Sequence, residues 1–157
     1  MRTGIGYDIH AFAPGRPLVL GGIRVPHEAG LGGHSDADVL THALIDALLG
    51  AAALGDIGGH FPPDDAAYHN ANSLDLLRRT VDLVTDAGYR VVNVDATVVA
   101  EAPKLSPHTG AMRAALADAL GIELDAVSIK ATTADRLGVV GRGEGIAALA
   151  VALLDST

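Results

Sequence analysis

Residues 35–54 read SDADVLTHALIDALLGAAAL, and they contain the clearest helix pattern in the chain. The opening Ser35-Asp36-Ala37-Asp38 has the form of a capping box, in which side-chain oxygens satisfy the first free N–H groups of a helix. Apolar residues then recur with the helical period of about 3.6 residues. They are Val39, Leu40, Ala43, Leu44, Ala47 and Leu48. The pattern predicts a helix from Ser35 to about Leu54.

Strand patterns lie on both sides of this helix. A glycine-interrupted strand is expected over residues 2–9, with Asp8 and His10 at its end, and residues 91–99 and 127–131 predict two more strands. Gly21-Gly22 predicts the turn of a hairpin made by its flanking segments. Residues 146–154 are apolar and ambiguous, because their alanine content favours a helix. We expect a strand there, chiefly on the family resemblance described below.

Two further helices are expected, over residues 73–88 behind Asn72 or Ser73 and over residues 107–121. Pro107 suits the first helical position, and Gly121 is a typical end residue. Residues 55–70 form a long loop rich in Gly, Pro and Asp, and residues 28–34 and 132–145 form glycine-rich loops. In a compact domain such a long loop is more often functional than filler.

Composition excludes several classes of function. The 157 residues suit one domain, 1–157, with a formal net charge of -8 that repels a phosphate backbone. Tryptophan is absent and aromatic residues make up 3%, so base stacking is poorly supplied and we expect no nucleic-acid partner. Without cysteine there is no disulfide and no thiol nucleophile. No apolar run approaches the roughly 18 residues of a membrane span, so we expect a soluble, cytoplasmic protein without a membrane partner.

Histidine and carboxylate side chains are the remaining candidates for a transition-metal site. Asp8 and His10 are two residues apart on a strand and share one face. With His42 on the helix they would supply one oxygen and two nitrogen ligands, the pattern of a catalytic zinc site with an open position. Asp38 or Asp46, each four residues from His42, would orient its imidazole. The alternative is that Asp8 forms a turn and that His42 is a half-buried helix residue paired with Asp38.

Three loops have residues suited to phosphate groups. The loop of residues 30–35 brings His34 and Ser35 to a helix N-terminus, which attracts anions, although Ser35 alone would also serve as a cap. Residues 130–133 (KATT) offer two hydroxyls beside a cation. Arg142 lies between two glycines, which suits either close approach of a ligand or a flexible turn with a solvated arginine. No phosphate-loop or dinucleotide-binding fingerprint is present.

Six motifs in order resemble the 2-C-methyl-D-erythritol 2,4-cyclodiphosphate synthase family. They are residues 4–10 (GIGYDIH), 33–40 (GHSDADVL), 56–58 with 61–62 (DIG, FP), 102–104 with 107–108 (APK, PH), 130–133 (KATT) and 141–147 (GRGEGIA). The resemblance covers essentially the whole chain. It implies an α/β (α+β) subunit, with a mixed β-sheet packed on one side by helices and assembled as a homotrimer around a central cavity.

The resemblance also implies the reaction and its site residues. The family converts 4-diphosphocytidyl-2-C-methyl-D-erythritol 2-phosphate to the 2,4-cyclodiphosphate and releases CMP, at active sites between subunits, in the non-mevalonate isoprenoid pathway. Zinc ligands carry over onto Asp8, His10 and His42, and transition-state stabilisation onto His34 and Thr133. Asp135 stands where the family has a glutamate ligand to a second cation, Mg²⁺ or Mn²⁺. Substrate-binding positions carry over onto Asp8, His10, His34, Ser35, Asp56, Ile57, Gly58, Phe61, Asp65, Ala100, Pro103, Lys104, Thr132, Thr133, Asp135, Val139 and Arg142.

Val139 and Arg142 match positions that face the central cavity of the trimer in the family, where an isoprenoid diphosphate can bind. The family often has an aromatic residue where this chain has Val139. The remaining histidines, His27, His60, His69 and His108, are interpreted as surface or structural residues. Two alternatives to the cyclising enzyme are a zinc phosphoesterase that uses a metal-bound hydroxide and a non-enzymatic trimer that senses isoprenoid or nucleotide phosphates.

Overall fold

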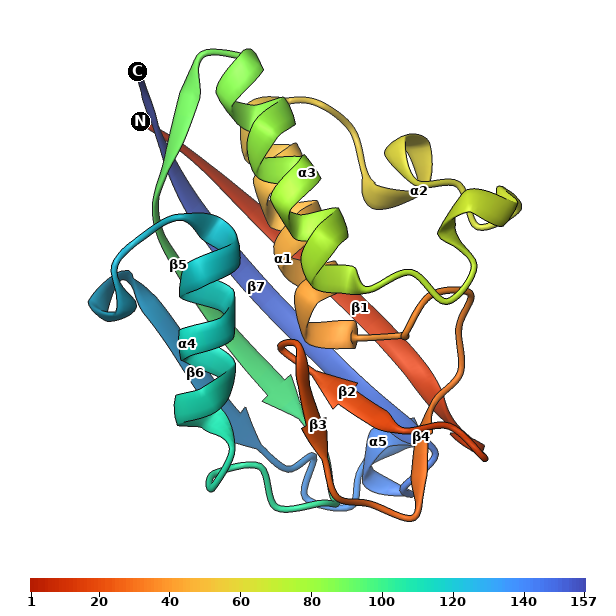
Figure 1. Cartoon of the computed structure of the whole chain (residues 1–157). Helices are drawn as coiled ribbons and strands as arrows, with labels where there is room; N and C mark the ends of the chain where they lie inside the picture. The colour runs from red at the N-terminus through yellow and green to blue at the C-terminus, as the bar shows by residue number, and fades with distance from the viewer.

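A five-stranded sheet with helices against one face organises residues 1–157, which the computed structural model describes in full (Figure 1). The strands in spatial order are β4 (Ala29–Leu31), β1 (Arg2–Pro14), β7 (Gly145–Ser156), β5 (Tyr89–Val99) and β6 (Val127–Thr132). Only β5 and β6 run parallel, and the other pairs are antiparallel. The single-domain α+β fold with a mixed sheet is therefore confirmed.

The three long helices lie on one side of this sheet, and a small hairpin completes the domain. The long helices are α1 (Val39–Ala52), α3 (Ser73–Asp86) and α4 (Thr109–Leu120). Shorter elements are α2 (Ile57–His60), α5 (Gly138–Gly141) and 3-10 turns at Ala66–Tyr68 and Leu124–Ala126. The hairpin pairs β2 (Leu18–Leu20) with β3 (Ile23–Val25). Figure 1 shows α1, α3 and α4 in front of the sheet and the two chain termini side by side. No helix combines the length and apolarity that crossing a bilayer requires.

The ambiguous apolar segment near the C-terminus is a strand, as expected. In β7, Ala148, Ala150 and Ala152 are buried, and α1 packs against this strand. The alternate residues Leu149 and Val151 are exposed on the opposite face. Alanine is therefore frequent in this strand because a helix packs against it, and the high helix propensity of alanine is overridden by packing.

The backbones of strand β1 and helix α1 are in close contact. A Cβ atom added to Gly6 would lie 1.9 Å from the carbonyl oxygen of Ala43, and one added to Gly4 would lie 2.0 Å from that of Ala47. Only glycine on the strand, facing alanine on the helix, permits this approach. Residues of β1 with even numbers consequently face α1, and those with odd numbers face away from it.

The predicted start of α1 is wrong by four residues, because Asp38 rather than Ser35 caps the helix. Asp38 Oδ1 accepts from Thr41 N (3.1 Å) and Gly21 N (2.9 Å), while Oδ2 accepts from Gly22 N and Thr41 Oγ1, each at 2.7 Å. Burial raises the pKa of this carboxyl, and the bonds from Gly22 and Thr41 oppose the rise. The Asp38 side chain thus joins the turn of the β2–β3 hairpin to the helix. A capping-box pattern does not predict this contact, because the pattern contains only residues at the helix start.

Other predicted boundaries also move. Helix α4 begins at Thr109 with His108 as its cap, so Pro107 lies before the helix instead of at its first position. Strand β1 extends to Pro14, which places Asp8 and His10 in its interior. The predicted loops contain the short elements β4, α2 and α5. These elements have three or four residues each, too few for a periodic pattern to reveal.

The sheet face opposite the helices exposes apolar side chains. On β1, Ile5 is 68% exposed and Tyr7 is 54% exposed, and the pairing register sets them beside Val151 and Leu149 of β7. These neighbours are also exposed. A contiguous apolar patch of this kind commonly marks an interaction surface.

We predict that Gly6→Ala destabilises the fold. The added methyl group would meet the backbone of α1, so the helix must move, and overpacking of this kind costs about 1–3 kcal/mol of the free energy of unfolding. Urea denaturation measures the change. Gly50→Ala is the matched control, since Gly50 lies within α1 and a Cβ atom added there would lie 4.0 Å from its nearest neighbour, the carbonyl oxygen of Ile5. That control should be neutral or stabilising by about 0.5–1 kcal/mol. Equal stability of Gly6→Ala and the native chain would contradict the close contact.

Candidate functional site

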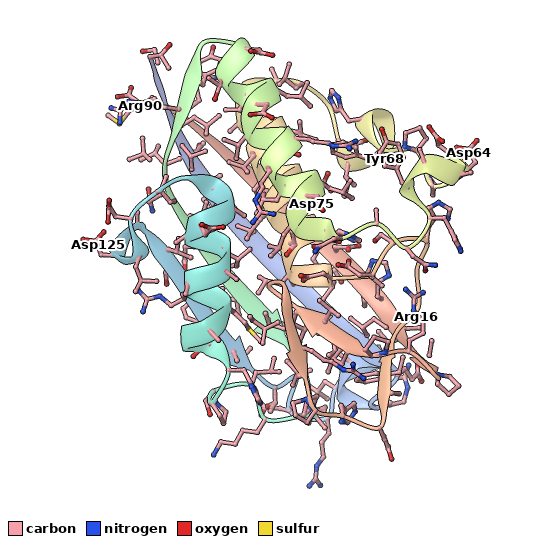
Figure 2. The ribbon with its side chains drawn as sticks, viewed as in Figure 1. Arg16, Asp64, Tyr68, Asp75, Arg90 and Asp125 are labelled. Carbon is pink, nitrogen blue, oxygen red and sulfur yellow. The ribbon has the colours of Figure 1, made fainter.

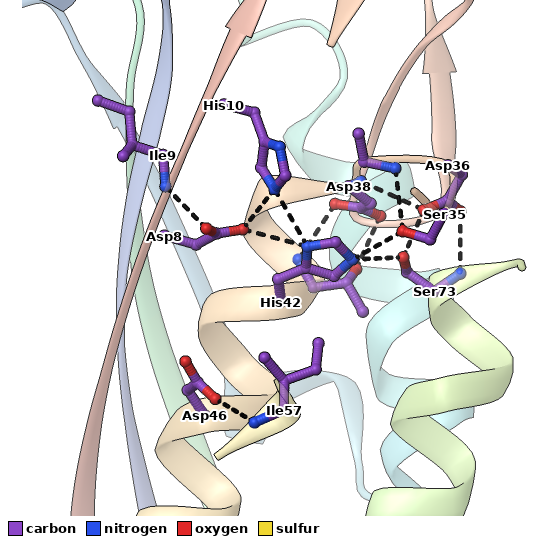
Figure 3. Close-up of polar contacts among 12 residues, drawn as sticks. Asp8, Ile9, His10, Ser35, Asp36, Asp38, His42, Asp46, Ile57 and Ser73 are labelled. Carbon is purple, nitrogen blue, oxygen red and sulfur yellow. Dashed lines mark hydrogen bonds and ion pairs between the residues drawn. The ribbon is translucent and has the colours of Figure 1, made fainter. Parts of the chain in front are cut away.

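Three side chains converge between β1 and α1, as Figure 3 shows. Asp8 Oδ2 lies 2.9 Å from His10 Nε2 and 3.1 Å from His42 Nδ1. The two histidine nitrogens are 3.3 Å apart. Because Asp8 and His10 follow Gly4 and Gly6 on the same face of the strand, the close β1–α1 contact brings them to His42.

The hydrogen bond to the Nδ1 atom of His10 leaves its Nε2 atom suited to metal coordination. His10 Nδ1 lies 2.6 Å from the carbonyl oxygen of Gly32, which can only accept, so Nδ1 carries the proton and Nε2 has a free electron pair. Burial lowers the pKa of His10, but the hydrogen bond and charge of Asp8 outweigh it and raise the pKa above its ordinary value. Burial likewise raises the pKa of Asp8, yet hydrogen bonding and charge interaction with His10 and His42, when these imidazoles are protonated, hold it well below its usual range.

The donor set fits a transition-metal ion. One carboxylate oxygen and two imidazole nitrogens lie within 4.8 Å of one another, and each residue is partly or fully shielded from solvent. Three protein ligands of these types suit zinc with a fourth position open to a ligand. The alternative of a turn-forming Asp8 and a His42 paired with Asp38 is wrong, because Asp8 lies within a strand and Asp38 bonds elsewhere.

The expected support of His42 by Asp38 or Asp46 is also wrong. Asp46 Oδ1 accepts from Ile57 N at 2.8 Å and so ties α2 to α1. The second nitrogen of His42, Nε2, instead lies 2.9 Å from Ser73 Oγ and 3.2 Å from Ser35 Oγ. Spacing along α1 predicts neither hydroxyl at this nitrogen, since Ser73 belongs to α3 and Ser35 to the loop before α1.

A cavity of about 240 Å³ lies over the three ligands. Its lining includes eight of the residues that the resemblance implied: Asp8, His10, His34, Ser35, His42, Ile57, Gly58 and Phe61. Pro63, Tyr68 and Leu76 also line it and were not foreseen. Asp56 and Asp65 lie beside the cavity as helix caps, with Oδ1 atoms that accept from Gly59 N and Ala67 N.

Arg16 holds the loop that carries His34 and Ser35. Its guanidinium, labelled in Figure 2, donates to the carbonyl oxygens of Gly33 and Ser35 from the turn after β1. The buried Asp38 carboxylate accepts from Thr41 N at the helix N-terminus, so the expectation of Ser35 as the helix cap is wrong. The anion site expected at this end of the helix stays a prediction. His34 and Ser35 reach the cavity from the loop.

A second cavity, of about 270 Å³, lies at the opposite edge of the sheet. Five of the implied residues line it: Ala100, Pro103, Lys104, Thr132 and Thr133. Glu101, Leu105, Ser106 and Ala131 line it as well and were not expected. The two cavities share no residue. The strands β1 and β6 beside them are separated by β7 and β5, so three strand spacings of about 4.8 Å place them some 14 Å apart.

Glu101 fixes the loop that carries Thr133 and Asp135. Its Oε1 accepts from Ala134 N at 2.8 Å and from Arg136 N at 3.2 Å. Between these two bonds the chain takes positive φ angles, 49° at Asp135 and 64° at Arg136. The Thr133 hydroxyl lies 3.3 Å from Asp135 Oδ1. The loop thus presents a hydroxyl and a carboxylate together, but away from the three metal-ligand candidates.

The other implied residues lie outside both cavities. Val139, in α5, is exposed, and Arg142 pairs with Glu144 at 2.8 Å. Among the histidines interpreted as structural, His60 lies 2.8 Å from the Leu54 carbonyl oxygen. His27 packs on Phe12, His69 packs on His34, and His108 caps α4. The occupant of a central cavity near Val139 stays a prediction.

Comparisons with known proteins agree with one another. The family model described as the YgbB family matches residues 1–155. A curated relative from Thioalkalivibrio sulfidiphilus, named 2-C-methyl-D-erythritol 2,4-cyclodiphosphate synthase, is 62% identical over 156 residues, covering 99% of this chain and 98% of the relative. The resemblance found in the six motifs is therefore confirmed.

Solved structures share the fold. Bifunctional IspDF from Campylobacter jejuni matches with a TM-score of 0.96 and 43% identity over 99% of this chain, which spans 42% of that longer protein. A structure described as a CDP complex of IspF from Plasmodium falciparum matches with a TM-score of 0.86 and 32% identity, covering 99% of this chain and 96% of that one.

We predict that the chain binds zinc through the three converging side chains. His42→Ala should weaken zinc binding more than about 100-fold, since loss of residues that merely support a ligand already costs 10–100-fold. Competition with a chromophoric chelator measures the affinity. His27→Ala is the control, because His27 packs on Phe12 and does not contact the three residues. Unchanged zinc affinity in His42→Ala would exclude this site.

Proposed function

The chain belongs to the YgbB family, and from this membership we propose that it converts 4-diphosphocytidyl-2-C-methyl-D-erythritol 2-phosphate to the 2,4-cyclodiphosphate with release of CMP. The observation that carries the proposal is the convergence of Asp8, His10 and His42 beneath a cavity lined by His34 and Ser35. A nucleotide-sized part of the substrate would occupy the second cavity, and the relative from P. falciparum is described as a CDP complex.

The reaction is an intramolecular phosphoryl transfer. An oxygen of the 2-phosphate attacks the β-phosphorus and forms a new P–O bond. The bond from the β-phosphorus to the oxygen bridging it to the α-phosphorus breaks, and CMP leaves with that oxygen. Because both reacting groups belong to one molecule, holding the substrate folded supplies much of the rate.

The side chains of the chain are suited to holding the substrate and stabilising charge. When bound, zinc at the three ligands and a second divalent cation near Asp135 would neutralise charge on the diphosphate. His34 and the Ser35 hydroxyl offer hydrogen-bond donors to phosphate oxygens, and Arg16 keeps their loop in place. Thr133 offers a hydroxyl to the diphosphate, and Lys104 offers a cation at the edge of the second cavity. No side chain need act as a nucleophile.

The active site is proposed to form between copies of the chain. The cavity with His34 and the cavity with Thr133 lie at opposite edges of one sheet, too far apart for one diphosphate. The exposed apolar face of β1 and β7 supplies a surface on which copies can associate. A homotrimer would bring the first cavity of one subunit to the second cavity of its neighbour, with closed symmetry.

We predict a cyclic diphosphate as the product. Phosphorus NMR of the reaction with the cytidyl substrate, zinc and magnesium should show the signals of the cyclic diphosphate and of CMP. A zinc phosphoesterase would instead release monophosphate from the substrate, which would overturn the cyclase proposal. Binding of the substrate without turnover would favour the sensor alternative.

We predict that two inactive variants complement each other. His42→Ala damages the first cavity and Thr133→Ala the second, so each alone should be nearly inactive. In trimers assembled at random from an equal mixture, half of the first cavities and half of the second cavities are intact. A site made of one of each is intact in about a quarter of cases, so about a quarter of the native activity should return. The two proteins are mixed under subunit-exchange conditions and assayed. Recovery no greater than the sum of the separate variants would place the whole site in one chain.

A further inference from the structure

The second nitrogen of His42 ends a chain of partly buried hydrogen bonds that reaches Asp36. His42 Nε2 lies 2.9 Å from Ser73 Oγ, and Ser73, the first residue of α3, is completely buried. The Ser73 hydroxyl is bonded to Asp36 Oδ1, and Ser73 N donates to Asp36 Oδ2 at 2.9 Å. Figure 3 shows these contacts on the side of His42 opposite Asp8.

The hydrogen bonds from His42 to Asp36 run in one consistent direction. An ionised carboxylate only accepts, so the Ser73 hydroxyl must donate its one hydrogen to Asp36. Ser73 Oγ can then only accept from His42, and so it selects the form of the imidazole with a proton on Nε2. Asp8 Oδ2, 3.1 Å from Nδ1, also accepts and competes for a proton on that atom, but a metal ion needs the Nδ1 electron pair and binds only the tautomer that Ser73 selects.

We propose that Asp36 and Ser73 are positioning residues that hold His42 in the tautomer able to bind a metal ion through Nδ1. The inference rests on the metal site of the proposed function and adds residues to it. It matches the role of the Gly32 carbonyl oxygen, which sets the other histidine, His10, in the opposite tautomer with Nε2 free. Two histidines thus present different nitrogens to one point, and each is set by its own partner.

Ser35 has a different role, although its hydroxyl also lies near His42. Its Oγ is 3.2 Å from Nε2, farther than that of Ser73, and accepts from Ala37 N at 3.2 Å. Ser35 lines the first cavity whereas Ser73 does not. With the N–H of His42 directed to Ser73, the hydroxyl hydrogen of Ser35 is free to point at a ligand oxygen in the cavity.

A purely structural role for Asp36 makes a different prediction. Asp36 Oδ2 caps the backbone N–H of Ser73 and so joins the start of α3 to the loop before α1. If that were its whole function, changes at Asp36 would alter stability but leave the zinc affinity of the folded protein unchanged. The zinc affinity of folded variants is therefore the decisive observable.

Asp36→Asn reverses the proton arrangement without changing the size of the side chain. The amide oxygen would keep the bond from Ser73 N, which leaves the NH₂ group to donate to Ser73 Oγ. The Ser73 hydroxyl hydrogen is then released to donate to His42 Nε2, and the imidazole proton is held on Nδ1, where Asp8 Oδ2 also accepts it. A protonated Nδ1 cannot coordinate a metal ion.

The experiment measures the tautomer and the zinc affinity on the full chain. Long-range ¹H–¹⁵N NMR of zinc-loaded protein at about pH 8 reports whether His42 Nε2 carries a proton. We expect Nε2–H in the native chain, exchanging with solvent more slowly than in Asp36→Asn. Zinc affinity by chelator competition should fall about 10–100-fold in Asp36→Asn and about 10-fold in Ser73→Ala. Urea denaturation confirms that each variant is folded.

A control separates the positioning role from general effects. Asp75→Asn removes an exposed charge from the first turn of the same helix and should keep zinc affinity within about threefold. Unchanged zinc affinity in folded Asp36→Asn, or a zinc-loaded native chain without a proton on His42 Nε2, overturns the proposal. If the native chain binds no zinc, the metal site of the proposed function fails instead.

Discussion

The contact between the backbones of β1 and α1 is the constraint on which the site depends. Gly6 lies against Ala43 and Gly4 against Ala47, so the strand and the helix run in opposite directions along their line of contact. Moving along the strand from Gly6 to Asp8 therefore corresponds to moving toward the start of the helix, where His42 lies. Any side chain at the glycine positions would widen the gap between the two elements. A wider gap would separate the carboxylate from the imidazole, so the packing of the core and the assembly of the metal ligands depend on the same contact.

The sequence predicts an element correctly where the residues of that element alone determine its structure. The helical period identified α1, and alternation identified β5 and β6. Prediction fails where a side chain far away in the sequence decides a local structure. Asp38 caps α1 because it also binds the turn of the β2–β3 hairpin, and no local pattern within residues 35–54 contains that information. The β-strand conformation of the alanine-rich β7 follows from helix packing on one face, which composition alone assigns to a helix.

The same distinction applies to the functional residues. The pair Asp8 and His10 was recognisable because residues two apart on a strand share a face. The partners of His42 were not, since Ser73 reaches it from the start of another helix. Sequence spacing proposed Asp38 and Asp46 because they lie four residues away on the same helix, but each of these carboxylates already accepts backbone N–H groups. Unsatisfied N–H groups at the hairpin turn and at α2 compete for the carboxylates, and burial makes leaving them unpaired costly.

The distribution of charge explains how a chain with a net charge of -8 can accept a polyanionic substrate. The carboxylates around the first cavity are engaged: Asp38 and Asp46 by N–H groups, and Asp36 by Ser73. Asp8 alone lines the cavity as a carboxylate, and it lies between two histidines. A divalent cation at that point would reverse the local sign of the charge, and the field near a substrate is set by such nearby groups more than by the net charge. Asp56 and Asp65 beside the cavity accept from Gly59 N and Ala67 N, and water and salt screen the exposed carboxylates that lie farther away. An acidic composition is therefore compatible with phosphate chemistry if a cation binds at this point. A cation binds only when the ligand nitrogens carry no proton. The hydrogen bonds from His10 to the Gly32 carbonyl oxygen and from His42 to Ser73 are therefore part of the electrostatics of the site.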